Sequence, residues 1–412
     1  MSRNSPSGPT SAAPIPSFAD MRRAWRADRC VQDSSAGVYL LWIRRFRGYC
    51  AQRGLDERAE LTLDGVHRFV VAHARRHRGW RRDSCSARSA LYALTRVYQV
   101  QGQVLPAWQS PRLARPPATA LLRAYADHLA RHGGKPEATV HKRVAHAGTL
   151  LAHLARQGKT WRTITLSDID AFLVAYAARY ARPTTADMAG TIRSFTRFLL
   201  ATGRIAVDLA ESVMAPVSPR YERPRCAWPW ADVQRLLRAI DTASARGLRD
   251  HALLLMMSAY GLGAGEVIGL QLSDVDWSAH TLRVVRPKTG AVFLLPLLPA
   301  VAKVLARYLR YGRPPHTPTR HLFIRMKMPF GPLGGSSAVR HILIKHARAA
   351  GIEAPYLGSH VLRHSYAARQ IDVGTSPQVL SDLLGHQDPE SLSAYVRIAT
   401  KSLREISLPV PT

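Results

Sequence analysis

The sequence predicts a mostly helical, multidomain fold that ends in a mixed α/β domain with a small β-sheet. Its 412 residues are too many for one ordinary hydrophobic core, so two or three domains are expected. Apolar residues recur at helical spacing over most of the chain. A strand–turn–strand pattern, LRVVRPKTGAVFLLPL, stands at 282–297 and predicts a hairpin.

Proline-rich stretches set the expected domain boundaries. Residues 1–16 are rich in Ser and Pro and are predicted to be a disordered tail. We expect a helical domain at 17–108, a second one at 118–215 and the mixed domain at 226–412. The stretch PVSPRYERPRCAWP at 216–229 combines four prolines with three arginines, which predicts an extended strap that can lie along phosphates. A solvated tether is the alternative interpretation.

The two helical domains look like copies of each other. The segment LTLDGVHRFV at 61–70 aligns with ITLSDIDAFL at 164–173, and LTRVYQVQG at 94–102 aligns with FTRFLLATG at 195–203. The offset stays near one hundred residues, which predicts an internal duplication. Two unrelated amphipathic bundles would also produce weak similarity, so that alternative stays open.

Each predicted helix has an apolar stripe. The stripes of the first domain are Val38, Leu41, Ile43 and Phe46; Val66, Phe69 and Val70; and Leu91, Leu94, Val97 and Tyr98. Those of the second are Leu150, Leu151 and Leu154; Ile169, Phe172 and Leu173; and Ile192, Phe195, Phe198 and Leu199. The mixed domain should begin with a helix on Val233, Leu236, Leu237 and Ile240, followed by a buried helix at 249–260.

The charge balance points to a polyanionic partner. Lys and Arg number 58 against 28 Asp and Glu, which gives a formal net charge of +30. A surface this basic repels itself unless a polyanion shares it, and nucleic acid is the first candidate. A generally basic protein is the rival interpretation, but the excess is spread through every segment. The helix expected after Ser336 and Ser337, with Arg340, Lys345 and Arg348, is predicted to be one DNA-facing surface.

Cysteine usage and hydropathy exclude several other classes. Four cysteines occur without CxxC spacing, so neither a disulfide scaffold nor a zinc module is indicated. The N-terminus lacks the apolar segment of a signal peptide, and runs such as ALLLMMSAY at 252–260 are too short to cross a bilayer. We therefore expect a cytoplasmic protein without membrane association.

The stretch from Ser359 to Tyr395 carries the residues suited to chemistry. Ser359 is a predicted helix N-cap, and the helix should end near Gly374. Within it, His360, Arg363 and His364 share one face because residues three and four apart are neighbours.

A second short helix should begin at Ser376 and Pro377 and close at Gly385 and His386. Its expected buried stripe is Val379, Leu380, Leu383 and Leu384. Asp388 and Pro389 then open a last short helix that carries Tyr395.

These side chains suit phosphodiester chemistry. A tyrosine, whose pKa is ordinarily near 10, attacks phosphorus only if its proton is removed and the phosphate charge is neutralised. Arg363 is the candidate phosphate clamp because its fork binds two oxygens and keeps its charge. His360 and His386 can donate hydrogen bonds or transfer protons near neutral pH.

The motifs HVLRH at 360–364 and LLGH at 383–386, with Tyr395 nine residues beyond, resemble the tyrosine recombinase (phage integrase) family. The resemblance covers roughly the last 185 residues. It implies Tyr395 as nucleophile, a 3′-phosphotyrosyl link to DNA, and cleavage and rejoining without metal, ATP or another cofactor. It further implies that Lys288, in the hairpin turn, protonates the leaving 5′-oxygen.

The same resemblance extends to the organisation of the chain. The segment 118–215 is similar to the SAM-like core-binding domain that precedes the catalytic domain in these recombinases. The segment 17–108 lies where other integrases carry an arm-binding domain. The implied partners are double-stranded DNA and further recombinase protomers, either copies of this chain or related recombinases, in a synaptic complex.

Several of these residues also have a simpler interpretation. A single histidine among 17 is more often structural than catalytic, and His364 is equally explained as a residue that braces the fold. His360 and His364 have the i, i+4 spacing of zinc proteases, but Val361 stands where those enzymes need a glutamate.

One position departs from the family pattern. In YGLGAGEVIGLQLSDVDW at 260–277, Gly261, Leu262, Glu266, Leu270, Asp274 and Asp276 fit a box that resembles GLRxxE. Gly263, however, stands where the first catalytic arginine is expected. Similar GLGAGE boxes occur among transposon-linked members of the family.

The predicted function is site-specific recombination or transposon integration, with an arginine such as Arg249, Arg283 or Arg286, or one from a partner, in the missing role. The alternative is a catalytically silent DNA-binding subunit that positions active partners.

Overall fold

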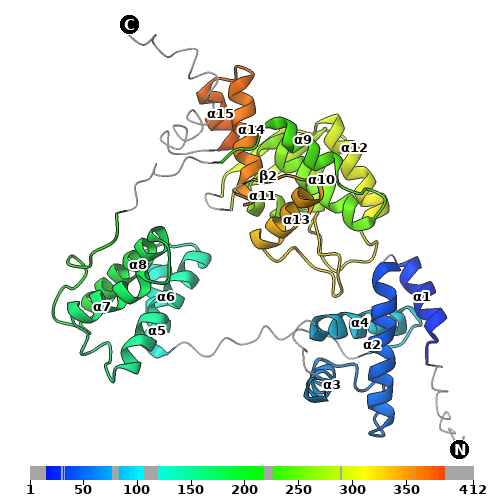
Figure 1. Ribbon diagram of the computed structural model, residues 1–412, viewed down its shortest axis with the longest axis horizontal. Helices are drawn as coiled ribbons and strands as arrows, with labels where there is room; N and C mark the ends of the chain where they lie inside the picture. Colours follow the sequence, from blue (N-terminus) through cyan, green and yellow to red (C-terminus); the bar gives the residue numbers. More distant parts are fainter. Residues whose placement is uncertain are drawn as a thin grey trace, which may run out of the picture. The chain divides into compact units, whose positions relative to one another are not determined.

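The computed structural model describes residues 15–28, 31, 33–76, 83–105, 119–217, 226–287, 290–354 and 356–385. These residues divide into two compact units. One unit combines residues 15–105 with residues 226–385, and the other contains residues 119–217. The prediction of a mostly helical chain with one small sheet is confirmed (Figure 1).

The described residues of the first helical domain form four helices around one core. They are α1 (Phe18–Ala27), α2 (Asp33–Ala51), α3 (Leu63–Arg76) and α4 (Asp83–Val100). Ser17 begins α1 with a capping box, because its hydroxyl accepts from the Asp20 amide while the Asp20 carboxylate accepts from the Ser17 amide. The predicted stripes of α3 and α4 are buried as expected.

The predicted stripe of α2 was half wrong. Ile43 and Phe46 are buried, but Val38 and Leu41 are 47% and 45% exposed. Trp42 is also buried, and the buried face of α2 runs along Ala36, Tyr39, Ile43, Phe46 and Cys50. These positions are spaced alternately by three and four residues, so they all lie on one face of the helix. The predicted stripe also included Val38 and Leu41, which are apolar but lie off that face.

The second unit is another four-helix domain. Its helices are α5 (Ala120–Arg131), α6 (Glu137–Arg156), α7 (Leu166–Ala177) and α8 (Arg182–Ala201). A capping box of Thr165 and Asp168 begins α7, and Lys159 binds the Asp168 carboxylate at 2.5 Å. All the predicted stripe residues are buried except Leu151, which is half-buried.

The two domains end corresponding helices in the same way. Gly54 after α2 and Gly158 after α6 have φ of 59° and 70°, a left-handed conformation that favours glycine. Gly102 after α4 and Gly203 after α8 repeat the device, with φ of 76° and 65°. In all four cases the amide that follows the glycine donates back to the carbonyl five residues earlier.

A row of three rings also recurs between the second and third helix of each domain. The neighbouring ring centroids lie 5.4 and 6.1 Å apart in the first domain and 5.1 and 5.7 Å apart in the second. The rows are Tyr49, Phe69 and His73 in the first domain and His153, Phe172 and Tyr176 in the second. Corresponding rings are 103 or 104 positions apart, the offset of the sequence alignment.

The C-terminal segment surrounds the buried helix α10 (Ala245–Tyr260) with α9 (Trp230–Arg238), α12 (Pro299–Arg307) and α14 (His360–Asp372). The remaining helices are α11 (Ala264–Gly269), α13 (Ser336–Ala349), α15 (Pro377–Leu384), the 3₁₀ turn η1 (Leu272–Asp274) and the π turn η2 (Tyr308–Gly312). Exposed Arg340, Lys345 and Arg348 lie on α13 as predicted.

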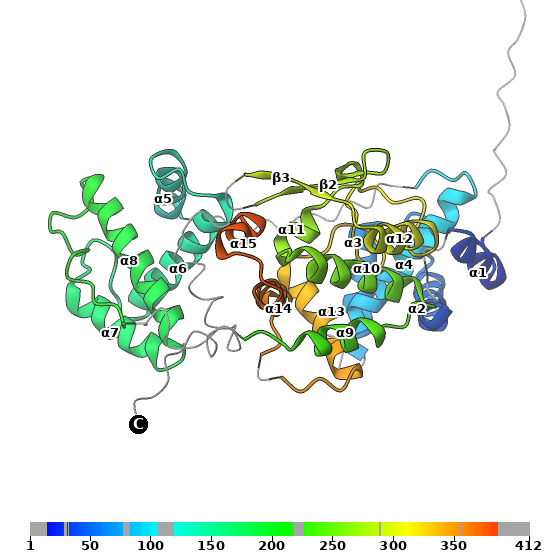
Figure 2. The same cartoon turned by 90° about the horizontal axis from the view of Figure 1, so that it is seen from above.

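A three-stranded antiparallel sheet has the order β1-β2-β3, with β1 (Val275–Asp276), β2 (Thr281–Val285) and β3 (Val292–Pro296). Figure 2 shows β2 and β3 side by side. Val284 pairs with Phe293 and Val285 with Val292, so the predicted hairpin is present in register. Leu282 and Val284 point into the core, whereas Arg283 and Val285 face outward.

Part of the C-terminal segment completes the core of the first domain. Ile324, Met328 and Phe330 belong to the same buried cluster as the residues of α1 to α4. The Arg249 guanidinium of α10 donates to the Ile324 carbonyl at 3.0 Å, and Phe323 beside it packs in the core around α10. The loop between η2 and α13 therefore joins the two cores.

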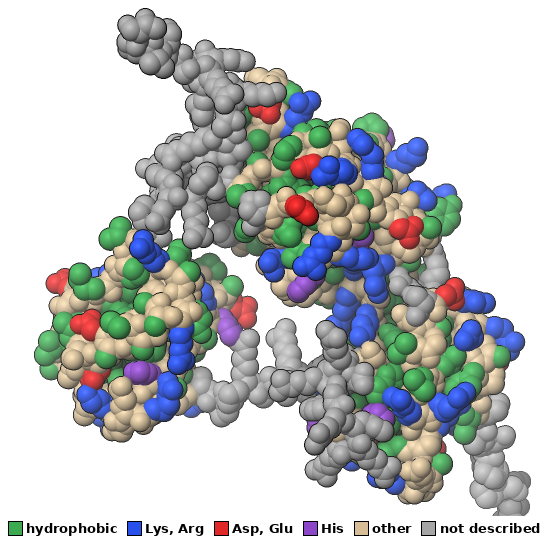
Figure 3. All heavy atoms as spheres, viewed as in Figure 1, with side chains coloured by type: hydrophobic (Ala, Val, Ile, Leu, Met, Phe, Trp, Pro, Cys, Tyr) green, Lys and Arg blue, Asp and Glu red, His purple; other side chains and the backbone are tan. Residues whose placement is uncertain are grey.

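Lys and Arg number 58 against 28 Asp and Glu in the whole sequence, and basic side chains are visible on the face of both units that Figure 3 shows. Within the described ranges, no helix is both long enough and apolar enough to cross a bilayer.

Candidate active site

Helix α14 carries the first motif and is anchored on its buried side. It begins at His360 and ends at Asp372, followed by Gly374 with φ of 87°, as predicted. The Ser365 hydroxyl accepts from the Trp228 amide at 2.8 Å, which ties α14 to the start of α9. Ser359 occupies the N-cap position as predicted, but its backbone is helical and its side chain makes no cap hydrogen bond.

The three residues of α14 that were predicted to share one face have different environments. His360 is exposed, whereas Arg363 and His364 are buried. The two imidazole rings lie 6.2 Å apart. Among the described residues, no group of three or more His, Cys, Asp or Glu side chains is arranged to hold a metal ion.

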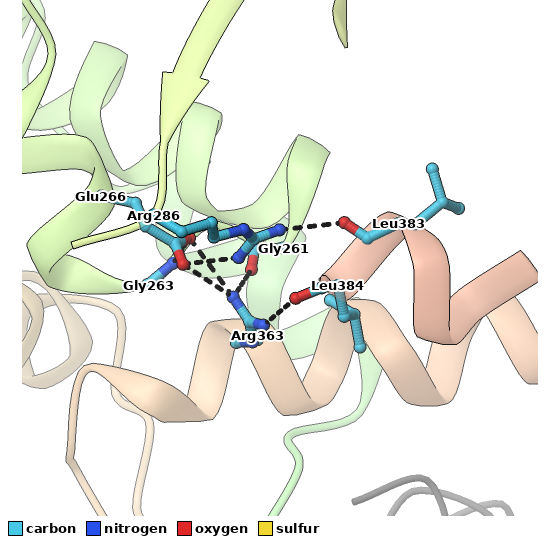
Figure 4. A network of polar contacts seen from close by, with 7 residues as sticks. All are labelled: Gly261, Gly263, Glu266, Arg286, Arg363, Leu383 and Leu384. Carbon is cyan, nitrogen blue, oxygen red and sulfur yellow. Dashed lines mark hydrogen bonds and ion pairs between the residues drawn. The ribbon is translucent and has the colours of Figure 1, made fainter. Parts of the chain in front are cut away.

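Arg363 reaches two other parts of the fold. Its Nη1 donates to the Gly261 carbonyl at 3.2 Å and forms an ion pair with Glu266, at 3.3 Å to Oε2. Its Nη2 donates to the Leu384 carbonyl at 2.5 Å. The guanidinium is thus fixed between the start of α11 and the end of α15, and it needs no substrate to hold it in place (Figure 4).

Glu266 is the centre of this arrangement. Its Oε2 accepts from the Gly263 amide at 2.7 Å, which caps α11. Its Oε1 accepts from Arg286 Nη1 at 2.5 Å and lies 3.4 Å from Arg363 Nη1. One carboxylate therefore binds two buried guanidinium groups, as Figure 4 shows.

Arg286 follows directly after β2 and is enclosed by three elements. Its Nη2 donates to the Leu383 carbonyl at 3.1 Å, and its guanidinium carbon lies 4.8 Å from the centre of the Phe293 ring. Gly385 closes the space, since a Cβ there would be 3.0 Å from Arg286 Nε. Gly385 also has φ of 61°, so glycine serves both the helix end and the close approach.

Helix α15 matches the prediction at both ends and on most of its buried face. The Ser376 hydroxyl accepts from the Val379 amide at 3.4 Å, and Leu380 and Leu384 are fully buried. Val379 was wrongly predicted as buried, because it is 50% exposed. The short helix buries only the side that packs on α14.

Comparisons with known proteins decide the family. The profile of the phage integrase family matches residues 230–402, and that of the phage integrase N-terminal SAM-like domain matches residues 122–203. The provisionally named integrase/recombinase y4gC of Sinorhizobium fredii is 35% identical over 177 residues, which are 43% of this chain and 90% of that relative. The chain belongs to the phage integrase family of tyrosine recombinases.

Other members extend the match. Tyrosine recombinase XerD of Proteus mirabilis is 31% identical over 256 residues, 61% of this chain and 80% of that protein. The crystal structure of a lambda integrase (75-356) dimer bound to a COC' core site shares the fold with a TM-score of 0.52. It is 18% identical and covers 71% of this recombinase and 98% of that chain.

The structure brings together some of the predicted catalytic residues of this recombinase. Arg363 lies among the polar contacts around Glu266, and His360 is the first residue of α14, the helix that carries Arg363. Lys288, His386 and Tyr395 lie outside the described residues. Sequence reasoning did not find the role of Glu266 as a shared carboxylate, although its place in the GLGAGE box singled it out.

Gly263 has the ordinary backbone of a helix N-cap in this recombinase, with φ of −74°. The tyrosine beside the site, Tyr366, packs against Gly261, and burial raises the pKa of its phenol. A raised pKa disfavours the phenolate, so Tyr366 is a poor candidate for the nucleophile.

Proposed function

We propose that Tyr395 is the nucleophile with which this tyrosine recombinase cleaves and rejoins double-stranded DNA, and that Arg363 binds the scissile phosphate. The observation that carries the proposal is the position of Arg363. Its guanidinium is buried and bound by Glu266 and by the carbonyls of Gly261 and Leu384. Electrostatic catalysis needs such a fixed charge, because a group already in place does not have to reorganise during the reaction.

The reaction follows from the proposed roles. The Tyr395 oxygen attacks phosphorus, so a P–O(Tyr) bond forms as the bond from phosphorus to the 5′-oxygen breaks. Lys288 gives the leaving oxygen its proton, while His360 or His386 accepts the phenol proton or donates to the phosphate. Rejoining reverses these transfers, with a free 5′-hydroxyl attacking the phosphotyrosine. The bond energy is conserved throughout.

Two residues that lie close in sequence to Lys288 and His386 support these roles. Arg286 precedes Lys288 by two positions, and Gly385 precedes His386 by one. Arg286 Nη2 donates to the carbonyl of Leu383, and the Gly385 backbone lies against the same guanidinium. The chain segments that lead to both proposed residues therefore meet beside Glu266.

We also propose that the second helical domain binds DNA as the core-binding domain and that the first is its duplicate. Three features support the duplication: four helices in the same order, left-handed glycines at equivalent helix ends and matching rows of rings. The excess positive charge supports DNA as the partner. Further protomers would complete a synaptic complex, and the reaction would take place in the cytoplasm of a bacterium.

The test is covalent capture on DNA. Wild-type protein is incubated with a pool of nicked suicide duplexes of randomised sequence, and covalently bound DNA is amplified and sequenced. The selected duplex then serves as substrate for Tyr395→Phe and for a control, Tyr311→Phe, whose side chain is exposed on η2. We expect the control to retain capture and Tyr395→Phe to lose it. Capture by Tyr395→Phe would show that another residue is the nucleophile.

The second candidate function is a catalytically silent DNA-binding subunit, which the glycine at position 263 favours. Failure of the wild-type chain to capture any duplex, with retained DNA binding in a gel-shift assay, would support this function and reject the first.

A further inference from the structure

Gly263 stands where the family pattern has its first catalytic arginine, so a second guanidinium for the scissile phosphate has to come from another position. A recombinase active site needs positive charge around the scissile phosphate, and Arg363 supplies one guanidinium. Among the other arginines of the segment that contains Gly263, the sequence offers Arg249, Arg283 and Arg286 as candidates for the missing role. Their surroundings differ enough to choose between them.

Two of the three arginines form ion pairs with other carboxylates. The Arg249 side chain is buried on α10, where it pairs with Asp250 and donates to the Ile324 carbonyl. Arg283 lies on the outward face of β2, half exposed, and pairs with Asp274 at 3.1 Å. Neither contacts Glu266 or Arg363.

Arg286 and Arg363 bind the same carboxylate and two neighbouring carbonyls. Both guanidinium groups bind Glu266 Oε1, at 2.5 and 3.4 Å. Their Nη2 atoms donate to the successive carbonyls of Leu383 and Leu384 at the end of α15. The two cations therefore lie side by side, with one carboxylate and a helix C-terminus between and around them to offset their repulsion.

We propose that Arg286 supplies the second guanidinium that binds the scissile phosphate, in place of the arginine absent at position 263. The inference rests on the proposed function of the site. Arg286 follows β2, whereas residue 263 lies at the start of α11. Even so, the Arg286 guanidinium binds Glu266, the carboxylate that accepts from the Gly263 amide.

Local charge agrees with this role. Arg286, Arg363 and Glu266 together carry a net charge of +1, which complements the single negative charge of a phosphodiester. Replacing Arg286 by a neutral residue would leave a net charge of zero. The Phe293 ring and the Gly385 backbone further confine the Arg286 guanidinium, so its position does not depend on bound DNA.

The experiment uses the full chain and the duplex selected with the wild-type protein. At saturating protein, Arg286→Ala should lower the rate of covalent capture about 100- to 1000-fold, the loss expected for one transition-state charge donor. The matched control is Arg283→Ala on the same strand, which should capture DNA within about two-fold of wild type because its surface ion pair contributes little.

A second variant separates phosphate binding from a purely structural link between the hairpin and α15. In the double variant Gly263→Arg/Arg286→Ala, a guanidinium at the family position should restore capture at least about ten-fold over Arg286→Ala, because charge is returned to the phosphate. A merely structural role predicts no such rescue, since residue 263 cannot rebuild the contact with the Leu383 carbonyl. Melting temperatures identify variants that fail to fold.

Three results would overturn the inference. One is wild-type capture by Arg286→Ala. Another is that Arg286→Ala loses capture and the double variant Gly263→Arg/Arg286→Ala does not regain it. This result counts if Gly263→Arg alone, with Arg286 present, folds and captures DNA. The third is failure of the wild type to capture any duplex, which would reject the proposed function and this inference together. The first two leave the proposed function intact.

Discussion

Replacing Gly261 by alanine should destabilise the catalytic segment far more than the same change two residues later. Gly261 ends α10 in a left-handed conformation, with φ of 64°. An alanine Cβ there would lie 2.5 Å from Tyr366 Cδ1 and 3.0 Å from Leu384 Cδ2. Both neighbours are buried, so neither can move away without disturbing the contact between α14 and α15.

Two effects set the magnitude. A non-glycine residue in the left-handed region costs about 1–2 kcal/mol, and overpacking a well-filled site typically costs a further 1–3 kcal/mol. We therefore expect Gly261→Ala to lower the free energy of unfolding by about 2–5 kcal/mol. Gly263→Ala is the matched control, because φ is −74° and the nearest atoms, those of the Glu266 carboxylate, lie 3.6 Å or more away. Its cost should be about 1 kcal/mol or less, the loss of a glycine N-cap.

Urea denaturation followed by circular dichroism measures both values. Gly261→Ala should also slow covalent capture, since the Gly261 carbonyl accepts from Arg363 Nη1. Equal stability of the two variants would refute the reasoning, because it would mean that neither the left-handed backbone nor the contact with Tyr366 constrains this position.

Three further predictions concern the cores and the surface. Asp250→Ala should cost about 3–5 kcal/mol in a urea titration, because it leaves the buried Arg249 charge unpaired. Burial raises the pKa of Asp250. Hydrogen bonds from His346 and Arg249 lower the pKa by a larger amount, so it lies below its ordinary value. The stabilisation should be present above that ordinary value, near 3.9, and be lost as the pH falls through the folded pKa; a cost that persists in stronger acid would contradict this. Phe330→Ala should accelerate hydrogen exchange in α1 to α4 but not in α5 to α8, since a buried Phe→Ala change costs about 3–5 kcal/mol, and equal protection would argue against the shared core. DNA affinity should fall about 1000-fold or more between 50 and 200 mM salt if at least six phosphates are neutralised, and a flat salt dependence would exclude charge as the main attraction.

The helical elements could be predicted from sequence because their signals are local. Apolar stripes located α9 and α15, an apolar run located α10, and glycines marked the ends of α14 and α15 correctly. The errors came from residues with apolar side chains on the exposed flank of a helix, such as Val38 and Val379. Residue type alone cannot tell which side of a short amphipathic helix meets a partner, because the partner lies far away in the chain.

The site was predictable only in part, for the same reason. The motif spacing identified Arg363, and the GLGAGE box drew attention to Glu266. Nothing local selected Arg286 over Arg249 or Arg283, since the contact that distinguishes it joins residues 20 positions apart through tertiary packing. The shared core of the first domain and the loop before α13 was likewise beyond the sequence, because those residues are separated by the whole second domain.

That shared core has a consequence for synthesis on the ribosome. The first domain emerges first, but the three residues that complete its core come much later: Ile324 follows Leu105 by 219 positions. At the usual 5–20 residues per second, the interval is about 10–40 s. During that time the second domain, whose core residues in the described part of the chain all lie within 121–215, can already have folded. A nascent chain halted before Ile324 would therefore present an unfinished apolar surface to chaperones, although its N-terminal helices had all been made.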